Sequence, residues 1–175
     1  MIADAPIELR RATASDAQAL ADAYLRNREH LRATEPHRSD GFYTAAGQAE
    51  RLAQPDSARW VVTDGDLVIG RADLSGIALG PFRSATLVYW IDGAYVGRGL
   101  ARRAVREVCR AARDELGLHR LEASTLLDNH ASQRVLAACG FERFGTAPAY
   151  LHIDGGWRDH HLFQRILHDG PPAHP

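Results

Sequence analysis

The segment of this sequence best suited to chemistry is Gly97-Arg98-Gly99, where two glycines stand at the start of an expected helix. Apolar residues recur at helical spacing between residues 101 and 116, so one face of this helix should pack against a core. The first N–H groups of a helix have no partner inside it, and the helix dipole adds a partial positive charge there. Because glycine lets a ligand approach the backbone closely, we predict a phosphate-binding turn at residues 97–102.

A second candidate region is the irregular segment 33–43, which carries Glu35, His37 and Tyr43. A proline and a glycine interrupt regular structure there. Loops that carry such groups often contact ligands, but a solvated connection has the same composition. Both interpretations stay open from the residues alone.

The remaining reactive residue types do not form a known site. His160 and His161 are neighbours on an expected strand, so their side chains should point to opposite faces and should not share a metal ion. Cys109 and Cys139 occupy apolar helical positions and are expected to be small core residues in a reducing cytosol. The sequence has no G-x-S-x-G turn for a serine nucleophile. We therefore expect no metal and no covalent catalysis of that kind.

The composition is that of an ordinary globular protein. The 175 residues suffice for one domain with a hydrophobic core, and 45% of them are hydrophobic. A formal net charge of −1 argues against a nucleic-acid binder held mainly by phosphate contacts. We expect neither a secretory signal nor a membrane span, and hence a cytoplasmic protein.

The elements that must position the candidate residues alternate between strands and helices. Strands are expected at residues 7–12, 59–63, 67–74, 85–91, 119–126, at 141–144 with a continuation at 150–153, and at 159–166. Residues 13–16 offer N-cap side chains for a helix that runs to about residue 32. Further helices are expected at 44–53, from the glycine turn to the Gly117 cap, and at 131–139. The strands on either side of the long helix should be parallel. These elements predict one α/β (α+β) domain over residues 1–168, with a mixed, mostly antiparallel sheet of about six to seven strands and about four helices. Residues 169–175 should form a flexible tail.

Three segments together carry a resemblance to a known family. They are LVYWI at 87–91, VGRGLA at 96–101, and NHASQRV at 129–135 followed by Gly140-Phe141. This pattern resembles the GCN5-related N-acetyltransferases (GNAT), over nearly the whole chain. The resemblance implies the GNAT fold, acetyl-CoA as co-substrate, and acetyl transfer to a primary amine.

A narrower resemblance is to the RimJ/RimL-type ribosomal-protein N-acetyltransferases. It rests on Asn27-Arg28-Glu29-His30-Leu31 with Glu35-Pro36, on Tyr89-Trp90-Ile91, and on the C-terminal stretch YLHIDGGWRDH at 150–160. It implies an acceptor that is the N-terminal α-amino group of a protein, with Glu35, Tyr43 and Tyr150 as substrate-binding residues. That protein could be ribosomal, and the enzyme a monomer or a homodimer without a direct nucleic-acid partner.

The family motif also implies which residues hold the cofactor. Backbone N–H groups of the glycine turn would bind the pyrophosphate, with Arg98 and Arg102 adding charge. Backbone groups of Trp90 and Ile91 would bind the pantetheine arm, and the Ile91 N–H would stabilise the oxyanion. The whole predicted set is Trp90, Ile91, Val96, Gly97, Arg98, Gly99, Leu100, Ala101, Arg102, Asn129 and Ser132. Val96 departs from the family, which usually has Gln or Arg there. Asn129 has two interpretations, as a helix cap or as a cofactor contact, and the motif favours the contact.

The same motif assigns catalytic roles less completely. It implies that the Ser132 hydroxyl gives a proton to the departing sulfur, although a serine at a helix start is also common. The general base is expected to be Glu122 or Glu35, with His37 and His152 as further candidates. Leu151 stands roughly where RimL-like proteins have a glutamate, so that base cannot be transferred.

Two other functions remain open from the sequence. One is an acetyltransferase for a small amine, such as an antibiotic, a polyamine or an amino acid. The other is a regulatory module that binds acetyl-CoA without catalysis.

Overall fold

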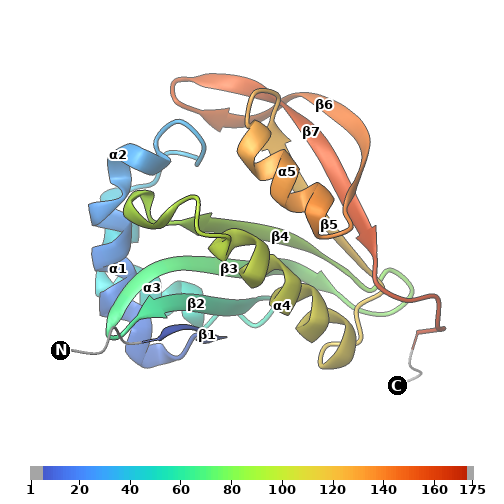
Figure 1. Ribbon diagram of the computed structural model, residues 1–175, viewed down its shortest axis with the longest axis horizontal. Coiled ribbons are helices and arrows are strands. Elements are labelled where there is room, and N and C mark those ends of the chain that lie inside the picture. The colour runs from blue at the N-terminus through green and yellow to red at the C-terminus, as the bar shows by residue number, and fades with distance from the viewer. Residues whose placement is uncertain (1–5, 173–175) are drawn as a thin grey trace.

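The computed structural model describes residues 6–172 and has one seven-stranded sheet (Figure 1). The spatial order of its strands is β1-β2-β3-β4-β5-β7-β6. The strands are β1 (Ile7–Arg11), β2 (Ala58–Asp64), β3 (Leu67–Ala78), β4 (Ser84–Ile91), β5 (Arg120–Leu126), β6 (Glu142–Ile153) and β7 (Gly156–Ile166). The helices are α1 (Ala17–Arg26), α2 (Arg28–Leu31), α3 (Ala45–Leu52), α4 (Leu100–Asp114) and α5 (His130–Ala138), with short 3-10 turns at Ala14–Asp16, Asp40–Tyr43 and Gly93–Tyr95. The predicted fold class is confirmed.

Two apolar layers hold the helices on the sheet. On one face, α4 packs Ala104, Val105 and Val108 against β2–β5. On the other face, α1 packs Leu20 and Tyr24 against residues of β2, β3 and β4. Figure 1 shows α4 and α5 in front of the sheet and α1 with α3 at its other side. The alternation of side chains along each strand explains why adjacent residues belong to different layers.

The sheet opens between β4 and β5. These two strands are parallel, as predicted, but only Ser84, Ala85 and Thr86 of β4 have register partners in β5. Beyond Thr86 the two strands separate, so the C-terminal half of β4 has a strand on one side only. This gap leads toward the turn that precedes α4.

Several boundaries differ from the expected ones. The expected helix that follows residues 13–16 and ends near residue 32 is divided at Asn27 into α1 and α2. β6 runs without interruption from residue 142 to 153, and β7 begins three residues earlier than expected. Both cysteines are buried and free, as expected. Of the expected tail, residues 169–172 lie outside helices and strands, and residues 173–175 are outside the described part of the chain. No helix within residues 6–172 is long and apolar enough to cross a membrane.

Candidate functional site

The predicted phosphate-binding turn lies at the end of β4. Gly97 and Gly99 have φ angles of +79° and +75°, in the left-handed region that favours glycine. Gly99 is the N-cap of α4 and gives no side-chain hydrogen bond to the first turn of the helix. A Cβ atom added at either glycine would meet no atom within 4 Å. The backbone here is therefore open to a ligand, next to N–H groups that the helix itself does not use.

Hydrogen bonds from the end of α1 fix the backbone of residues 92–94, which lead into this turn. Asp92, which follows β4, accepts bonds from Arg26 Nε (2.9 Å), Asn27 Nδ2 (2.8 Å) and Ala94 N–H (2.9 Å). Asn27 Oδ1 accepts from Gly93 N–H at 3.0 Å. These bonds hold the pKa of the Asp92 carboxyl below its usual range, although burial acts in the opposite sense. The break between α1 and α2 thus positions Asn27 to tie both helices to the turn.

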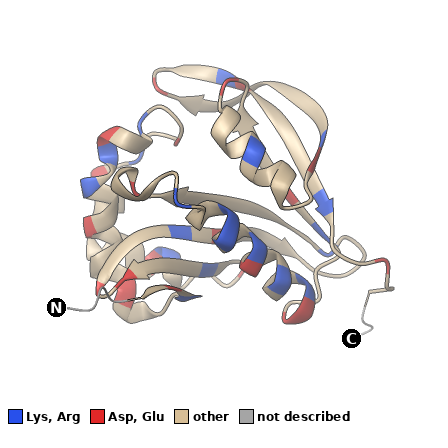
Figure 2. Cartoon of the chain, viewed as in Figure 1, with Lys and Arg blue, Asp and Glu red and all other residues tan. Residues whose placement is uncertain are grey.

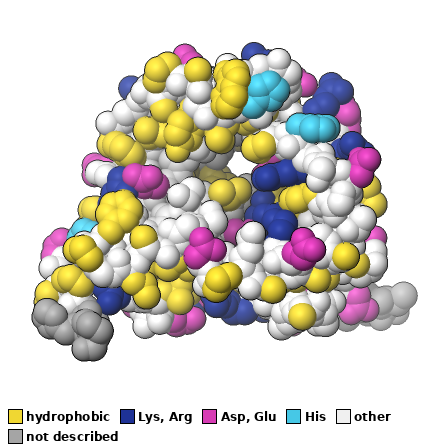
Figure 3. Space-filling view, turned by 180° about the vertical axis from the view of Figure 1, so that it is seen from behind, with side chains coloured by type: hydrophobic (Ala, Val, Ile, Leu, Met, Phe, Trp, Pro, Cys, Tyr) yellow, Lys and Arg dark blue, Asp and Glu magenta, His cyan; other side chains and the backbone are white. Residues whose placement is uncertain are grey.

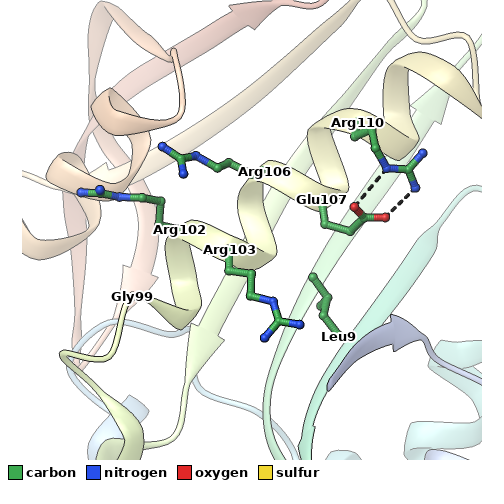
Figure 4. Close-up of a pocket in the computed structure, with 7 residues that line it drawn as sticks. All are labelled: Leu9, Gly99, Arg102, Arg103, Arg106, Glu107 and Arg110. Carbon is green, nitrogen blue, oxygen red and sulfur yellow. Dashed lines mark hydrogen bonds and ion pairs between the residues drawn. The ribbon is translucent and has the colours of Figure 1, made fainter. Parts of the chain in front are cut away.

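A shallow groove of about 470 Å³ runs along α4 from Gly99 (Figure 4). In Figure 4, Arg102 and Arg106 extend toward the side on which α5 lies, and Arg103 extends toward β1. Arg103 Nη1 donates to the Ile7 carbonyl at 3.0 Å. Figure 2 shows acidic residues among the arginines toward the C-terminal end of α4.

The arginines on and just before α4 differ in whether their guanidinium groups are already paired with acidic side chains or remain available to a ligand. Arg110 pairs with Glu107 and Glu115, and Arg113 pairs with Asp114. Such exposed pairs are typical of a solvated helix face. Arg98 stacks its guanidinium 4.7 Å from the Tyr95 ring centroid, beside the glycine turn. Arg98 and Arg102 thus remain the candidates for phosphate contacts. The neighbouring Val96 side chain is 55% exposed and has no group that could form a hydrogen bond.

The register of β4 decides which backbone groups face the gap. The Asp92 N–H, one residue beyond the Gly70–Ile91 register pair, donates to the Ile69 carbonyl at 2.7 Å. Hydrogen-bonded and non-bonded pairs alternate along an antiparallel ladder. The backbone groups of Trp90 therefore point toward β3, whereas those of Tyr89 and Ile91 point toward the gap. The register supports the prediction that the Ile91 backbone contacts the pantetheine arm. It does not support the same prediction for Trp90, because Tyr89 is the residue whose backbone faces the gap there. No role was predicted for Tyr89 from the sequence.

The Trp90 side chain belongs to the α1 layer. It is buried, and its ring lies 5.1 Å from that of Tyr24. His30 Nε2 donates to the Ile91 carbonyl at 3.2 Å, so this carbonyl is covered from the α2 side.

Ser132 lies opposite Tyr89, across the gap. Its Oγ atom is 2.7 Å from the Tyr89 hydroxyl, and either group can donate. Burial raises the pKa of Tyr89 to about 12, so the phenol stays protonated near neutral pH. Asn129 caps α5, because its Oδ1 accepts from the Ser132 N–H at 3.2 Å. A cofactor contact from Asn129 would therefore use its amide nitrogen.

The two carboxylates predicted as bases lie in different environments. The Glu35 side chain is 14% exposed, and its Oε2 lies 3.8 Å from Arg71 Nη2. Glu122 is half-exposed on β5, where it pairs with Arg120 at 2.6 Å and stands opposite Thr86, the last β4 residue with a register partner in β5. Neither is an isolated buried acid of the kind that favours a general base.

The other predicted substrate residues lie beside α2 and on the β6–β7 hairpin. Tyr43 has the Arg28 guanidinium 4.7 Å from its ring centroid. Tyr150 is exposed on β6, near the tip of the β6–β7 hairpin, where His152 contacts Trp157. His37 is exposed on the segment after α2. Arg32, at the end of α2, pairs with Asp154 in the hairpin turn at 3.9 Å, so α2 and the β6–β7 hairpin meet there.

A buried charge cluster lies beneath α1 and α3. Asp73 of β3 accepts hydrogen bonds from Arg59 and Arg71, and Arg51 of α3 lies 3.8 Å away from it. Arg71 is only 4% exposed and also approaches Glu35. The sequence pattern did not reveal this cluster, since charged residues on a strand usually mark a solvated face.

Comparisons with known proteins agree with this geometry. The family model described as an acetyltransferase (GNAT) domain matches residues 7–142. The chain is 34% identical over 167 residues to the [ribosomal protein uS5]-alanine N-acetyltransferase of Escherichia coli, covering 90% of this chain and 86% of that protein. The chain belongs to the GNAT acetyltransferase family.

Solved structures of GNAT proteins extend this result. The ribosomal-protein-S5-alanine acetyltransferase from Vibrio fischeri has a TM-score of 0.90 and 36% identity, over 95% of this chain and 96% of that one. The Mycobacterium smegmatis RimJ structure in complex with CoA-disulfide has a TM-score of 0.83 and 26% identity, over 93% and 82%. This GNAT protein is thus an acetyl-CoA-dependent N-acetyltransferase.

The residues of the GNAT site fit a long anionic cofactor. The glycine turn leaves space where side chains would otherwise fill it, and the first turn of α4 offers N–H groups to a pyrophosphate. The gap between β4 and β5 exposes backbone groups of Tyr89 and Ile91 to an extended arm. When bound, acetyl-CoA supplies the thioester carbonyl that an amine attacks. Among residues 6–172 no group of metal-ligating side chains is assembled.

Substituting Gly99 tests the turn. We expect Gly99→Ala to raise the KM for acetyl-CoA by about tenfold, because a non-glycine residue in the left-handed region costs about 1–2 kcal/mol and the turn would shift to relieve it. Gly80→Ala is a matched control, since Gly80 has a φ of +72°, equally open surroundings and a place in the β3–β4 turn. Steady-state kinetics with varied acetyl-CoA measures the effect. An equal KM in both variants would contradict the assignment.

Proposed function

We propose that the acceptor of this N-acetyltransferase is the N-terminal α-amino group of a protein, and that this protein is ribosomal. The proposal rests on the similarity to the E. coli enzyme named for alanine of uS5, which extends over most of both chains. Exposed aromatic side chains on the β6–β7 hairpin also support it. Tyr150 is 43% exposed and Trp157 is 67% exposed. Figure 3 shows an opening near the centre of the molecule, with apolar side chains above it.

The proposed chemistry uses residues on both sides of the gap. The Ile91 N–H, which points into the gap, would stabilise the negative charge that develops on the carbonyl oxygen. The Ser132 hydroxyl would donate a proton to the departing sulfur, and Tyr89 would orient it through their 2.7 Å contact. Glu35 or Glu122, acting through water, would accept the proton of the amine.

The charges near Glu35 disfavour a polyamine as the alternative acceptor. A polycation needs several carboxylates, whereas Arg38, Arg51 and Arg71 surround Glu35 and Asp73 on this face. An acceptor with a single amine and a neutral or acidic remainder fits better. Among small amines, an amino acid is therefore the stronger alternative.

A thiol-release assay with acetyl-CoA tests the proposed acceptor. We expect turnover of peptides that begin with Ala or Ser, and much slower turnover of a panel of small amines. The chain contains no lysine, since its 21 basic side chains are all arginine, so no lysine side chain of the enzyme consumes acetyl-CoA in the background. Turnover confined to small amines would overturn the proposal for a protein acceptor. Binding of acetyl-CoA without thiol release on any amine would overturn the catalytic proposal as a whole.

A further inference from the structure

The charge cluster beneath α1 and α3, taken together with the neighbouring Arg38, contains more positive than negative charge. Its cations are Arg38, Arg51, Arg59 and Arg71, and its anions are Glu35 and Asp73. All six side chains lie on the α1–α3 face of the sheet or in the segment that follows α2. Arg71 and Asp73 are buried and the other four side chains are partly buried, so the excess positive charge is only partly screened by water.

The hydrogen bonds show which arginines are already used. Arg59 donates to Asp73, to the Arg51 carbonyl at 2.9 Å and to Gln54 at 2.6 Å. Arg71 donates to Asp73 through Nη1, whereas its Nε atom does not take part in that hydrogen bond. Among the described residues, Arg71 Nε and Arg38 Nε are buried without any hydrogen-bond partner. Each such group favours the approach of an acceptor atom.

Arg38 is the cation with the weakest compensation. Its guanidinium lies 5.0 Å from the ring centroid of Phe42, and Arg51 lies 4.7 Å from the same ring. Burial lowers the pKa of Arg38; the nearby Glu35 opposes this by favouring the charged form, and Arg51 and Arg71 lower the pKa further. A further carboxylate beside Arg38 would relieve both the burial of its charge and the repulsion from the other two arginines.

The cluster adjoins the reacting part of the site. Arg71 is the register partner of Trp90 on β4, and the Tyr24 ring contacts both of these side chains. Trp90 precedes Ile91, whose backbone faces the gap. Glu35, a predicted acceptor residue, links Arg71 to the segment that carries Arg38. An acceptor that enters from the α2 side would therefore meet these cations beside its amine.

We propose that Arg38 and Arg71, next to Glu35, bind a carboxylate of the acceptor. Guanidinium groups recognise carboxylates through paired N–H···O bonds, and such charge-assisted bonds are stronger than neutral ones. The carboxylate can come from an acidic side chain early in a peptide or from the α-carboxylate of a free amino acid. This inference rests on the proposed acetyl transfer to an amine and adds the chemistry next to that amine.

Two matched acceptor pairs test the inference. One pair is the peptide amides Ala-Glu-Ala and Ala-Gln-Ala, and the other is free alanine and alaninamide. We expect kcat/KM to favour the acid by about 10- to 100-fold in one of the pairs, and the pair that responds identifies the source of the carboxylate. Equal values within both pairs would overturn the inference while leaving the acetyltransferase activity demonstrated.

Variants of Arg38 locate the effect. In Arg38→Gln the acid-to-amide ratio should fall to near one, and Arg38→Lys should restore part of it because the charge is kept. Arg113→Gln removes an exposed charge on the distant α4 and should keep the full ratio. A ratio that survives in Arg38→Gln would overturn the assignment of the carboxylate to this cluster. Thermal unfolding of each variant confirms that it is folded.

A binding measurement separates this inference from the proposed function. The same acceptor pairs are titrated calorimetrically into enzyme saturated with CoA, where no acetyl transfer is needed. Tighter binding of the acid, lost in Arg38→Gln, supports the carboxylate site even if turnover is absent. Equal binding of acid and amide, together with equal turnover, overturns it.

Discussion

Asp73→Asn should lower the free energy of unfolding by about 3–5 kcal/mol. Asp73 is buried and receives hydrogen bonds from Arg59 and Arg71, with Arg51 close by. Asparagine keeps the volume but removes the charge that compensates these cations. The guanidinium groups would then remain buried without their common partner. Urea unfolding followed by circular dichroism measures the change.

Asp22→Asn is the matched control for this prediction. Asp22 is exposed on α1 and accepts one bond from Gln18 at 2.9 Å, which an asparagine oxygen can also accept. Its stability should change by no more than about 0.5 kcal/mol. If the two variants lost similar stability, the cluster would not be the source of the stabilisation that we assign to Asp73.

Ser132→Ala should lower kcat on the order of 100-fold, with little change in the KM for acetyl-CoA. The hydroxyl of Ser132 is proposed to give its proton to the departing sulfur, a step that affects the transition state more than binding. The substitution should not disturb α5, because Asn129 caps the helix through the backbone N–H of residue 132. Steady-state kinetics with the best peptide acceptor measures both constants.

Tyr89→Phe and Ser15→Ala define the expected range for the Ser132 prediction. Tyr89→Phe should have a smaller effect than Ser132→Ala, since Tyr89 orients the hydroxyl without replacing it. Because its pKa is about 12, Tyr89 should add no falling limb to the pH profile of kcat between pH 6 and about 10. The exposed Ser15 is a control whose loss should not alter kcat. An unchanged kcat in Ser132→Ala would assign the proton to another donor.

The sequence predicts the parts of this protein that depend on local patterns. Gly97 and Gly99 adopt positive φ angles, which glycine reaches without the steric cost of a side chain, so the residue type signals such positions directly. The apolar spacing of α4 and the alternation of β5 follow from burial of one face of each element. The parallel pairing of β4 and β5 follows from a helical connection between two strands.

The features that the sequence did not reveal depend on contacts between distant residues. Asn27 divides a helix whose apolar spacing continues through it, because its side chain bonds to Asp92, 65 positions away. Arg71 and Asp73 resemble residues of a solvated strand face until α1 and α3 are placed over them. Tyr89 lies within the family motif, but its contact with Ser132 could not be predicted because Ser132 comes from another element. The glycine turn and the resemblance to the GNAT family could be found from sequence, but the residues that brace the turn could not.

The short contact between β4 and β5 also bears on the cooperativity of folding. Only three register pairs join the half of the sheet formed by β1–β4 to the half formed by β5–β7, so the two halves share few backbone hydrogen bonds. A molecule in the gap would bond to both halves and would stabilise the native state by its binding free energy. We expect the amide hydrogens of Tyr89 and Ile91 to exchange with solvent within seconds in the free protein and far more slowly with CoA bound. Hydrogen exchange would record the bound cofactor as a higher opening free energy for these two amides, on the edge of β4 that the short β4–β5 pairing leaves open.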